Sequence, residues 1–540
     1  MKKILAIMIS VFLILPFSAC NSRTVEKEED GIQIDKSEKN AGEDQENDGI
    51  GEIESQEIPI LRIGAANDFK YGVQDSLSLV TDFMIGFNER FEPIPNLISD
   101  WEINDDATEF ELHLRKDVKF HDGTNFNAEV CKYDLESLGK LFYSAYINNL
   151  ESIEILDDYS LAVKFKKSNL GFIEELYKIP AFTIDSIDED GNLVDYTGTG
   201  PFKLEDYKED EEAKLSRNDD YWNKDKLPKI EELKWYVIPD PDARALALQS
   251  SQVDIIGISE HGKSMSHSSI EIFNNDDDYK LIRERLDSYT SVSAIRLNWL
   301  KEPMDDIYLR KALAYAIDRE AMAEDIYFGE VNPVGHMMNP EFIDGSKKVD
   351  EFYYDLEKAK EILKEGDYKL EGDKLTKDGK PVELNILTVS EIEYKDASVF
   401  IQKEFEKLGI KSNIEVYDFS LWNEKMKSGE YDIALMAHWF EPTYSNIAFY
   451  GLEPADNTGF GLGYGMNKEM INAGNGILNA KNQDELRKYL DDFWIENYEQ
   501  VNSIPVFADF RTAIYKSDFE GFKFDSNYFL IDLSEVKLAK

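Results

Sequence analysis

Residues 95–129 read PNLISDWEINDDATEFELHLRKDVKFHDGTNFNAE, and this stretch carries the clearest structural pattern in the chain. Within it, Phe110, Leu112 and Leu114 alternate with charged or polar residues, which predicts a strand with one buried face. The same alternation recurs over residues 161–165. We therefore expect half-buried strands in this part of the chain.

Helical and strand-like patterns alternate through the rest of the body. Apolar residues and several alanines recur at helical spacing over residues 310–325, and Asp355 can cap a helix that follows it. A further helix over residues 401–408 is expected to stop at Gly409, before strand-like patterns over residues 414–416 and 433–437. Alternation of this kind is typical of α/β lobes.

The length of the chain requires more than one lobe. It has 540 residues, of which 42% are hydrophobic, whereas single cores stop growing near roughly 250–300 residues. Two or more lobes are expected, and the hydrophobic content excludes disorder for most of the chain.

The N-terminus has the layout of a secretory signal. Lys2 and Lys3 precede an apolar run over residues 4–17, which is too short to span a bilayer as a helix. The run ends in Phe17-Ser18-Ala19-Cys20, which resembles a bacterial lipobox. By that resemblance, residues 1–19 are a lipoprotein signal peptide and Cys20 is the lipidated first residue of the mature protein. The alternative is a plain cleaved signal with an incidental cysteine.

The segment after Cys20 is strongly acidic. Residues 21–57 contain 13 Asp and Glu against four Lys and Arg, with no aromatic residue. Such a composition cannot bury enough apolar surface to offset the entropy of ordering. We predict that residues 20–57 form an acidic disordered tether that holds the body off a membrane.

Charge and side-chain chemistry exclude several classes of function. The net charge is −48, so the chain lacks the basic footprint that a nucleic acid or an anionic lipid surface requires. The sequence contains no nucleophile elbow, zinc-protease pattern or phosphate loop, and we expect neither an enzyme nor a bound cofactor. Once Cys20 is lipidated, Cys131 has no partner, and we expect it to be a small buried residue.

Four stretches resemble the solute-binding proteins of bacterial ABC importers, in the oligopeptide, dipeptide and nickel-binding family (family 5). They occur in the order and spacing of that family and extend the resemblance over residues 58–540. The stretches are Pro95-Asn96-Leu97-Ile98-Ser99-Asp100-Trp101 with Val118-Lys119-Phe120-His121-Asp122-Gly123; Gly198-Thr199-Gly200-Pro201-Phe202 with Tyr221-Trp222; Ile238-Pro239-Asp240-Pro241 with Arg244 and Val253-Asp254; and Leu309-Arg310-Lys311-Ala312-Leu313 with Ala316-Ile317-Asp318-Arg319. The aromatic residues in them are expected to be core and corner residues.

The resemblance implies a two-lobed, periplasmic-binding-protein-like α/β fold of class II with an extra subdomain. The ligand cleft would lie between the lobes, which close on a solute like a hinged clamp. Lobe I would comprise residues 58–285 and 503–540, with an inserted subdomain at about 93–197. Lobe II would comprise residues 286–502.

The ligand is less clearly indicated than the scaffold. The peptide branch of the family carries an aspartate on a Trp-containing loop, and the matching stretch here offers Glu441 in its place. The nickel branch clamps a metal chelate with arginines, which are lost at the matching positions, and His438 is the one obvious metal ligand. The cleft is expected to be lined by Tyr143, Tyr146, His438, Trp439, Glu441 and Tyr444.

The leading hypothesis is a lipid-anchored receptor on the extracytoplasmic face of the bacterial cell membrane. It would capture an oligopeptide, dipeptide or metal chelate such as one of nickel, and deliver it to an ABC permease and ATPase complex. We expect a monomer that touches the membrane through its lipid anchor alone. The alternative is a sensory or adhesion lipoprotein on the same scaffold without transport, and an extracellular hydrolase ranks third.

Overall fold

The computed structural model describes residues 60–539 with gaps at 71–75, 89–91, 142–144, 189–191, 258–266, 275, 286–290, 338–348, 391, 440–467 and 525–530. Residues 58–540 form one unit, separate from residues 1–57. The signal peptide, Cys20 and the acidic tether therefore lie outside the described residues and stay predictions. No helix in the described part has both the length and the apolar character needed to cross a bilayer.

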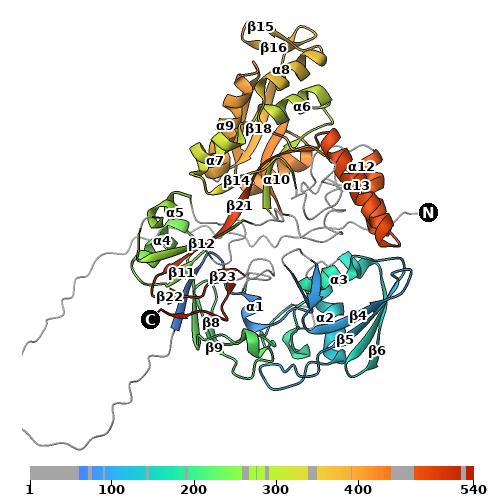
Figure 1. Ribbon diagram of the computed structural model, residues 1–540, viewed down its shortest axis with the longest axis vertical. Coiled ribbons are helices and arrows are strands. Elements are labelled where there is room, and N and C mark those ends of the chain that lie inside the picture. Colours follow the sequence, from blue (N-terminus) through green and yellow to red (C-terminus); the bar gives the residue numbers. More distant parts are fainter. Residues whose placement is uncertain are drawn as a thin grey trace, which may run out of the picture. The chain divides into compact units, whose positions relative to one another are not determined.

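A twelve-stranded mixed sheet runs through both lobes (Figure 1). Its order is β19-β18-β20-β13-β21-β11-β1-β10-β9-β8, and β12 and β14 also pair with β21. The strands are β1 (Ile60–Ala65), β8 (Phe202–Lys208), β9 (Glu212–Arg217), β10 (Glu232–Val237), β11 (Ile255–Ile256), β12 (Tyr279–Arg285), β13 (Ser291–Leu297), β14 (Val331–Pro333), β18 (Glu383–Val389), β19 (Lys411–Tyr417), β20 (Ile433–Trp439) and β21 (Ser503–Lys516).

Strand β21 belongs to both lobes. Its first residues pair with β13, from Ser503 opposite Arg296 to Ala508 opposite Val292. Its last residues pair with β12, from Phe510 to Lys516, and with β11. The chain therefore passes between the lobes inside β21, and the lobe boundaries expected at 285 and 503 stay a prediction. The two-lobed α/β fold itself is confirmed.

The alternating apolar pattern predicted a half-buried strand in this part of the chain. The structure confirms that strand as part of a four-stranded sheet in the first lobe. Strand β5 (Glu109–Leu114) buries Phe110, Leu112 and Leu114. It lies between β4 (Ile98–Ile103) and β7 (Ser160–Phe165), with β6 (Leu150–Asp157) at the edge. Helices α2 (Ala128–Leu141) and α3 (Phe172–Glu175) share one core with this sheet. Cys131 is fully buried in that core, as expected.

In the second lobe, four helices pack on one face of the sheet around β18 (Figure 1). They are α6 (Ile307–Ala316), α7 (Arg319–Tyr327), α8 (Leu356–Glu365) and α9 (Ile392–Glu406). Asp355 caps α8 by accepting from the Lys358 backbone N–H, as predicted. Gly409, with φ +79°, lies just beyond α9 and allows the turn into β19.

The helix expected over residues 310–325 is in fact two helices. Ile317 is extended, with φ −93° and ψ 117°, and separates α6 from α7. Asp318 then caps α7, because its side chain accepts from the Ala321 backbone N–H at 3.0 Å. The apolar spacing continues through the break, which is why the periodicity alone indicated one helix.

A helical hairpin covers the other face of the second-lobe sheet. It consists of α12 (Lys468–Asn479) and α13 (Gln483–Glu499). Val292 and Ala294 of β13 pack against this hairpin, while Ile295 and Leu297 face α6 to α9. Successive strand residues point to opposite faces, so β13 joins both cores.

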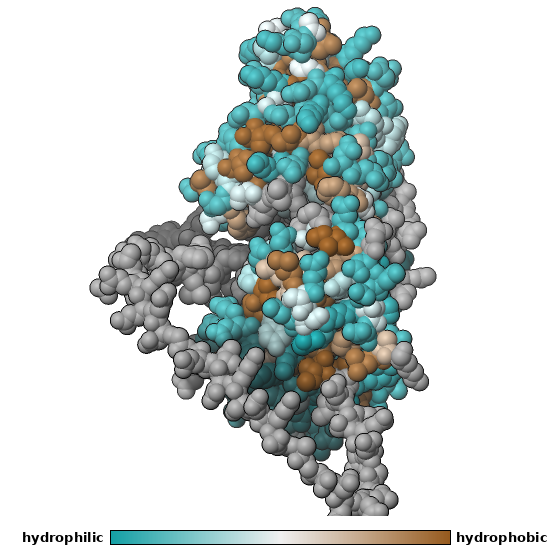
Figure 2. Space-filling view, turned by 90° about the vertical axis from the view of Figure 1, so that its left-hand side faces the viewer, coloured by the Kyte–Doolittle hydropathy of each residue, from teal (hydrophilic) through white to brown (hydrophobic). Residues whose placement is uncertain are grey.

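Shorter elements complete the described chain. The helices are α1 (Leu77–Val80), α4 (Pro241–Gln249), α5 (His267–Phe273) and α10 (Phe419–Ser428), with 3-10 turns at Ala145–Asn148, Leu176–Lys178, Ile184–Ser186 and Lys224–Lys226. The short strands are β2 (Ile85–Phe87), β3 (Pro93–Pro95), β15 (Lys369–Glu371), β16 (Lys374–Lys377), β17 (Lys380–Pro381), β22 (Phe519–Glu520), β23 (Lys523–Phe524), β24 (Ile531–Asp532) and β25 (Lys537–Leu538). The face in Figure 2 is mainly hydrophilic, with hydrophobic residues in separate small groups.

Candidate functional site

The carboxyl end of β20 lies beside the strands that lead from one lobe to the other. His438 is opposite Val292 of β13, and Val292 is in turn opposite Ala508 of β21. Trp439 is opposite Ser291, the first residue of β13. The backbone of His438 and Trp439 is therefore at the point of the sheet where the chain crosses between the lobes. Ligand pockets commonly form at such domain interfaces.

The other predicted site residues do not all reach this place. Tyr143, Glu441 and Tyr444 lie outside the described residues. Tyr146 is 1% exposed in the core of the first lobe, where its hydroxyl donates to the Leu135 carbonyl at 2.7 Å. Burial also raises the pKa of Tyr146 well above its usual value. In this conformation Tyr146 is a core residue.

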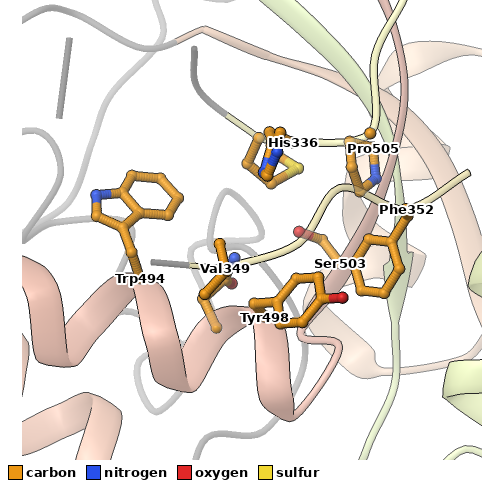
Figure 3. A pocket seen from close by; sticks show the side chains of 10 residues that line it. His336, Val349, Phe352, Trp494, Tyr498, Ser503 and Pro505 are labelled. Carbon is orange, nitrogen blue, oxygen red and sulfur yellow. The ribbon is translucent and has the colours of Figure 1, made fainter. Parts of the chain in front are cut away.

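A small pocket lies in the second lobe, close to the point where β21 passes from one lobe to the other (Figure 3). Its volume is about 20 Å³. The loop after β14, the segment before α8, the end of α13 and the start of β21 surround it. The lining residues are Gly335, His336, Met337, Val349, Phe352, Trp494, Asn497, Tyr498, Ser503 and Pro505.

His336 is a titratable residue that lines this pocket. Burial lowers the pKa of His336 below its usual value, although the nearby carboxylates of Glu351 and Asp350 oppose that shift. The ring is therefore neutral near pH 7 and offers one donor and one acceptor nitrogen. The Oε1 of Glu351 accepts from the backbone N–H of Gly335, a lining residue, at 3.1 Å.

Aromatic rings form one wall of the pocket. Phe352 and Tyr498 stack with centroids 4.6 Å apart at an interplanar angle of 23°. The hydroxyl of Tyr498 lies 3.5 Å from the hydroxyl of Tyr315. Burial raises the pKa of Tyr498, so the phenol stays protonated at neutral pH. Trp494 flanks the opposite side in Figure 3.

The pocket was not identified by reasoning from the sequence. Its residues come from segments at 335–352, 494–498 and 503–505, which pair and pack only in the folded chain. Each residue is unremarkable in its own segment, and none completes a catalytic or metal-binding spacing. The sequence signal that could have indicated the pocket is the occurrence of His336 and Asn497 as single polar residues among apolar ones. Single polar residues also occur in ordinary cores, so this signal does not distinguish a pocket.

The second family-like stretch, at residues 198–202 with Tyr221 and Trp222, has a structural role in the described chain. Asp82 is buried and accepts from the Tyr221 hydroxyl at 2.8 Å, the Trp222 indole N–H at 2.8 Å and the Thr199 hydroxyl at 2.9 Å. Burial is the largest influence on Asp82 and raises its pKa. A side chain on Gly200 would meet the Thr81 backbone N at 2.5 Å. These contacts fix a corner of the first lobe, as the sequence indicated.

Within the described ranges, no three His, Cys, Asp or Glu side chains are grouped so that they could hold a metal ion. His438 lies in β20, and the surroundings of its side chain are not described.

The comparison with protein families gives a match over residues 92–459. The matched family is "Bacterial extracellular solute-binding proteins, family 5 Middle". The match covers more than half of the chain and contains the stretches at residues 95–101, 198–202, 238–241 and 309–319.

Curated proteins with similar sequences are about one quarter identical to this chain. Heme-binding protein A of Haemophilus influenzae is 26% identical over 372 residues, which is 62% of this chain and 64% of the relative. The chain thus spans slightly less than two thirds of that relative. Di/tripeptide-binding protein 1 of Pseudomonas aeruginosa is 24% identical over 428 residues, which is 73% of this chain and 76% of the relative.

Solved structures agree on the fold. The crystal structure of NikA from Brucella suis in complex with Fe(III)-EDTA aligns with a TM-score of 0.78 at 20% identity. The alignment covers 89% of this chain and 100% of that one. At this level of identity, the likeness supports the two-lobed fold and leaves the ligand open.

Proposed function

Because this chain belongs to the bacterial extracellular solute-binding proteins of family 5, we propose that it is the capturing receptor of an ABC importer. As a member of that family, the chain is a solute-binding protein of the extracytoplasmic space and not an enzyme. The proposal adds that it encloses its solute between the two lobes and delivers it to a permease and ATPase complex.

The position of His438 and Trp439 is the observation that carries the proposal. Their backbone lies where β13 begins and where β21 passes from one lobe to the other. A solute held there would contact both lobes, and its binding energy would favour the closed arrangement of the clamp. β21 is a connection between the lobes that would absorb this motion.

The proposed solute is an oligopeptide, a dipeptide or a metal chelate. Relatives carry names that refer to di/tripeptides and to heme, and a structural neighbour holds Fe(III)-EDTA. For a peptide, Glu441 would pair with the free amine, since a buried ammonium requires an opposite charge. For a chelate, His438 would supply a nitrogen ligand, while Tyr143, Trp439 and Tyr444 would cover the ligand.

The proposed attachment to the membrane rests on the N-terminal sequence. A lipid on Cys20 would anchor the chain, and residues 21–57 would act as its tether. Two or more acyl chains anchor a protein stably, whereas one chain binds only reversibly. Replacement of Cys20 by Ser should move the protein from the membrane fraction to the medium. Retention of that variant in the membrane fraction would contradict lipid anchoring.

Native mass spectrometry of residues 58–540, purified without dialysis, tests the binding proposal. The native mass should exceed the denatured mass by one bound solute. Fragments of a peptide would favour the peptide alternative, and a metal isotope pattern with an organic chelator would favour the chelate. An empty protein that also binds nothing in a screen of peptides and chelates would contradict the receptor function.

A further inference from the structure

An ion pair joins the two lobes close to the point where β21 passes from one to the other. Arg283 of β12 belongs to the first lobe, and its Nη2 lies 2.6 Å from the Oε1 of Glu330, a buried residue of the second lobe. The same nitrogen donates to the Asn274 Oδ1 at 2.6 Å. β12 and β14 pair with consecutive parts of β21, and Glu330 directly precedes β14. This ion pair is therefore close to the axis about which the lobes would turn.

The lobes also touch at the turn between α12 and α13. The hydroxyl of Ser168, in the first lobe, donates to the carbonyl of Ala480 in that turn at 2.6 Å. Ala480 is 2% exposed. Leu170, two residues after Ser168, is partly buried against both the first-lobe core and the core under the α12–α13 hairpin. Ser168, Leu170 and Ala480 together are called the rim contact below.

Helix α13 separates the rim contact from the start of β21. The helix has 17 residues, so it is about 25 Å long at roughly 1.5 Å per residue. Its last residues lead to Ser503, where β21 begins, and its first residues follow the turn at Ala480, toward α3 of the first lobe (Figure 1). In a rigid rotation the displacement grows with the distance from the axis. The turn at Ala480 therefore moves further than Glu330 does, and the rim contact breaks when the lobes open.

Both sides of the rim contact are held in place by hydrogen bonds within their own lobes. In the first lobe, the backbone N–H of Asn169 donates to the Ala107 carbonyl at 2.8 Å. In the second lobe, Asn482 caps α13 by accepting from the Glu485 backbone N–H at 2.9 Å, and the Lys481 backbone N–H donates to the Glu485 Oε2 at 3.0 Å. Because both sides are already ordered, little conformational entropy is lost when they meet.

We propose that the rim contact is a latch, which acts together with the solute to hold the two lobes closed. The role of the solute in this proposal rests on the proposed function. One hydrogen bond of this kind changes an equilibrium only about two- to tenfold, so the latch alone leaves the lobes free to open. Solute and latch favour the same closed form. While that form is the minor one without solute, loss of the latch weakens solute binding by the factor by which it lowers the closed population.

Spin labels on both sides of the latch test it without any solute. Lys167→Cys and Lys481→Cys carry the labels, because both lysines are exposed and adjoin the latch residues. Cys131 is fully buried and stays unlabelled in the folded chain. Residues 58–540 are freed of solute by unfolding and refolding, then labelled. Pulsed electron paramagnetic resonance gives the distribution of distances between the two labels, and the latch predicts a short-distance population beside a longer one.

Substitutions in the labelled chain separate the latch from general effects on the first lobe. Ser168→Ala removes the donor and should lower the ratio of short to long distances about two- to tenfold. Leu170→Ala removes apolar contact between the lobes and should lower the ratio at least about threefold. Ser99→Ala is the control for the hydroxyl, because Ser99 donates to the His113 carbonyl inside the first lobe. Leu204→Ala is the control for the leucine, since Leu204 is partly buried on the same first-lobe core. Both controls should keep the wild-type ratio.

Three results would overturn the latch. They are a single population at long distance, a ratio that neither Ser168→Ala nor Leu170→Ala lowers, and a ratio that the control substitutions lower as much as the latch substitutions do. The receptor function is tested separately by the native mass of the purified chain. An empty protein in that test would contradict the receptor function and leave the distances between the labels unchanged, so the two failures are distinguishable.

Discussion

At the scale of single residues, buried arginines hold the second lobe together through backbone carbonyls. Arg319 donates to the carbonyls of Pro505, Ile317 and Ala314 at 2.8 to 3.2 Å. Arg310 donates to those of Gln500 and Met304 and lies 4.2 Å from the Trp299 ring. Burial lowers the pKa of each arginine to about 10, so both remain charged at pH 7. These residues of the family-like stretches therefore serve the scaffold.

Replacement of Arg319 by Met should strongly destabilise the second lobe. The change leaves three carbonyls without their donor, and unpaired buried groups of this kind cost about 1–3 kcal/mol each. We expect a loss of roughly 3 kcal/mol or more in the free energy of unfolding, measured with urea. Lys364→Met, at an exposed position of α8, is the control and should change stability by less than about 0.5 kcal/mol. Equal effects of both changes would contradict the role of Arg319.

His121 should make stability depend on pH. Burial is the largest influence and lowers the pKa of His121 to about 4, while its Nε2 lies 3.0 Å from the Gly200 carbonyl. The unfolded chain, with a histidine pKa near 6.5, binds more protons, so this contribution is complete above that value and is lost as the pH falls toward 4. Between pH 7 and pH 5 the wild type should lose about 2 kcal/mol more than His121→Gln.

Urea unfolding of both proteins at the two pH values measures that difference. His121→Gln keeps a donor for the Gly200 carbonyl but cannot titrate. Parallel losses in the two proteins would show that His121 does not carry the effect.

At the scale of elements, local patterns predicted strands and caps well but missed breaks and long-range pairing. The alternation at Phe110, Leu112 and Leu114 and the cap at Asp355 were confirmed because each depends on neighbouring residues. The break between α6 and α7 was missed because the apolar spacing runs through it, while the cap of Asp318 decides the boundary. Strand β21 could not be predicted as a shared strand, since its partners β12 and β13 lie more than 200 residues away.

The cap at Asp318 gives a prediction at this scale. Asp318→Ala removes the acceptor for the Ala321 backbone N–H and should cost about 0.5–2 kcal/mol of stability. Glu320→Ala, at an exposed position of the same helix, should have a much smaller effect. Thermal or urea unfolding distinguishes the two, and a neutral Asp318→Ala would show that the break is set by packing instead.

At the scale of the whole molecule, β21 joins the two lobes, because it pairs with β12 in one lobe and with β13 in the other. The two-lobed fold could be predicted from the family resemblance, because the residues that carry the resemblance stabilise the scaffold. It could not predict which side chains meet at the crossing. The strand pairing brings the backbone of His438 and Trp439 there, whereas Tyr146 lies in a core. The pocket at His336 and Ser503 depends on tertiary packing and was not predicted.

A pair of aromatic substitutions tests whether Trp439 covers the solute while Tyr146 serves the core. Trp439→Ala should abolish or greatly weaken retention of the native solute, because the proposed site loses a large covering surface. Tyr146→Phe removes only the hydrogen bond to the Leu135 carbonyl, so it should cost about 1 kcal/mol of stability and retain the solute. Native mass spectrometry of both variants is the measurement. Loss of solute from Tyr146→Phe alone would contradict the assignment.

The central claim is that the two lobes enclose a solute, and small-angle X-ray scattering tests it most directly. Residues 58–540 are freed of solute by unfolding and refolding, and scattering is recorded before and after addition of the solute identified by native mass spectrometry. The account predicts a smaller radius of gyration with solute, and the same decrease should be absent in Trp439→Ala. A radius of gyration that stays unchanged in the wild type while solute binds stoichiometrically would contradict it.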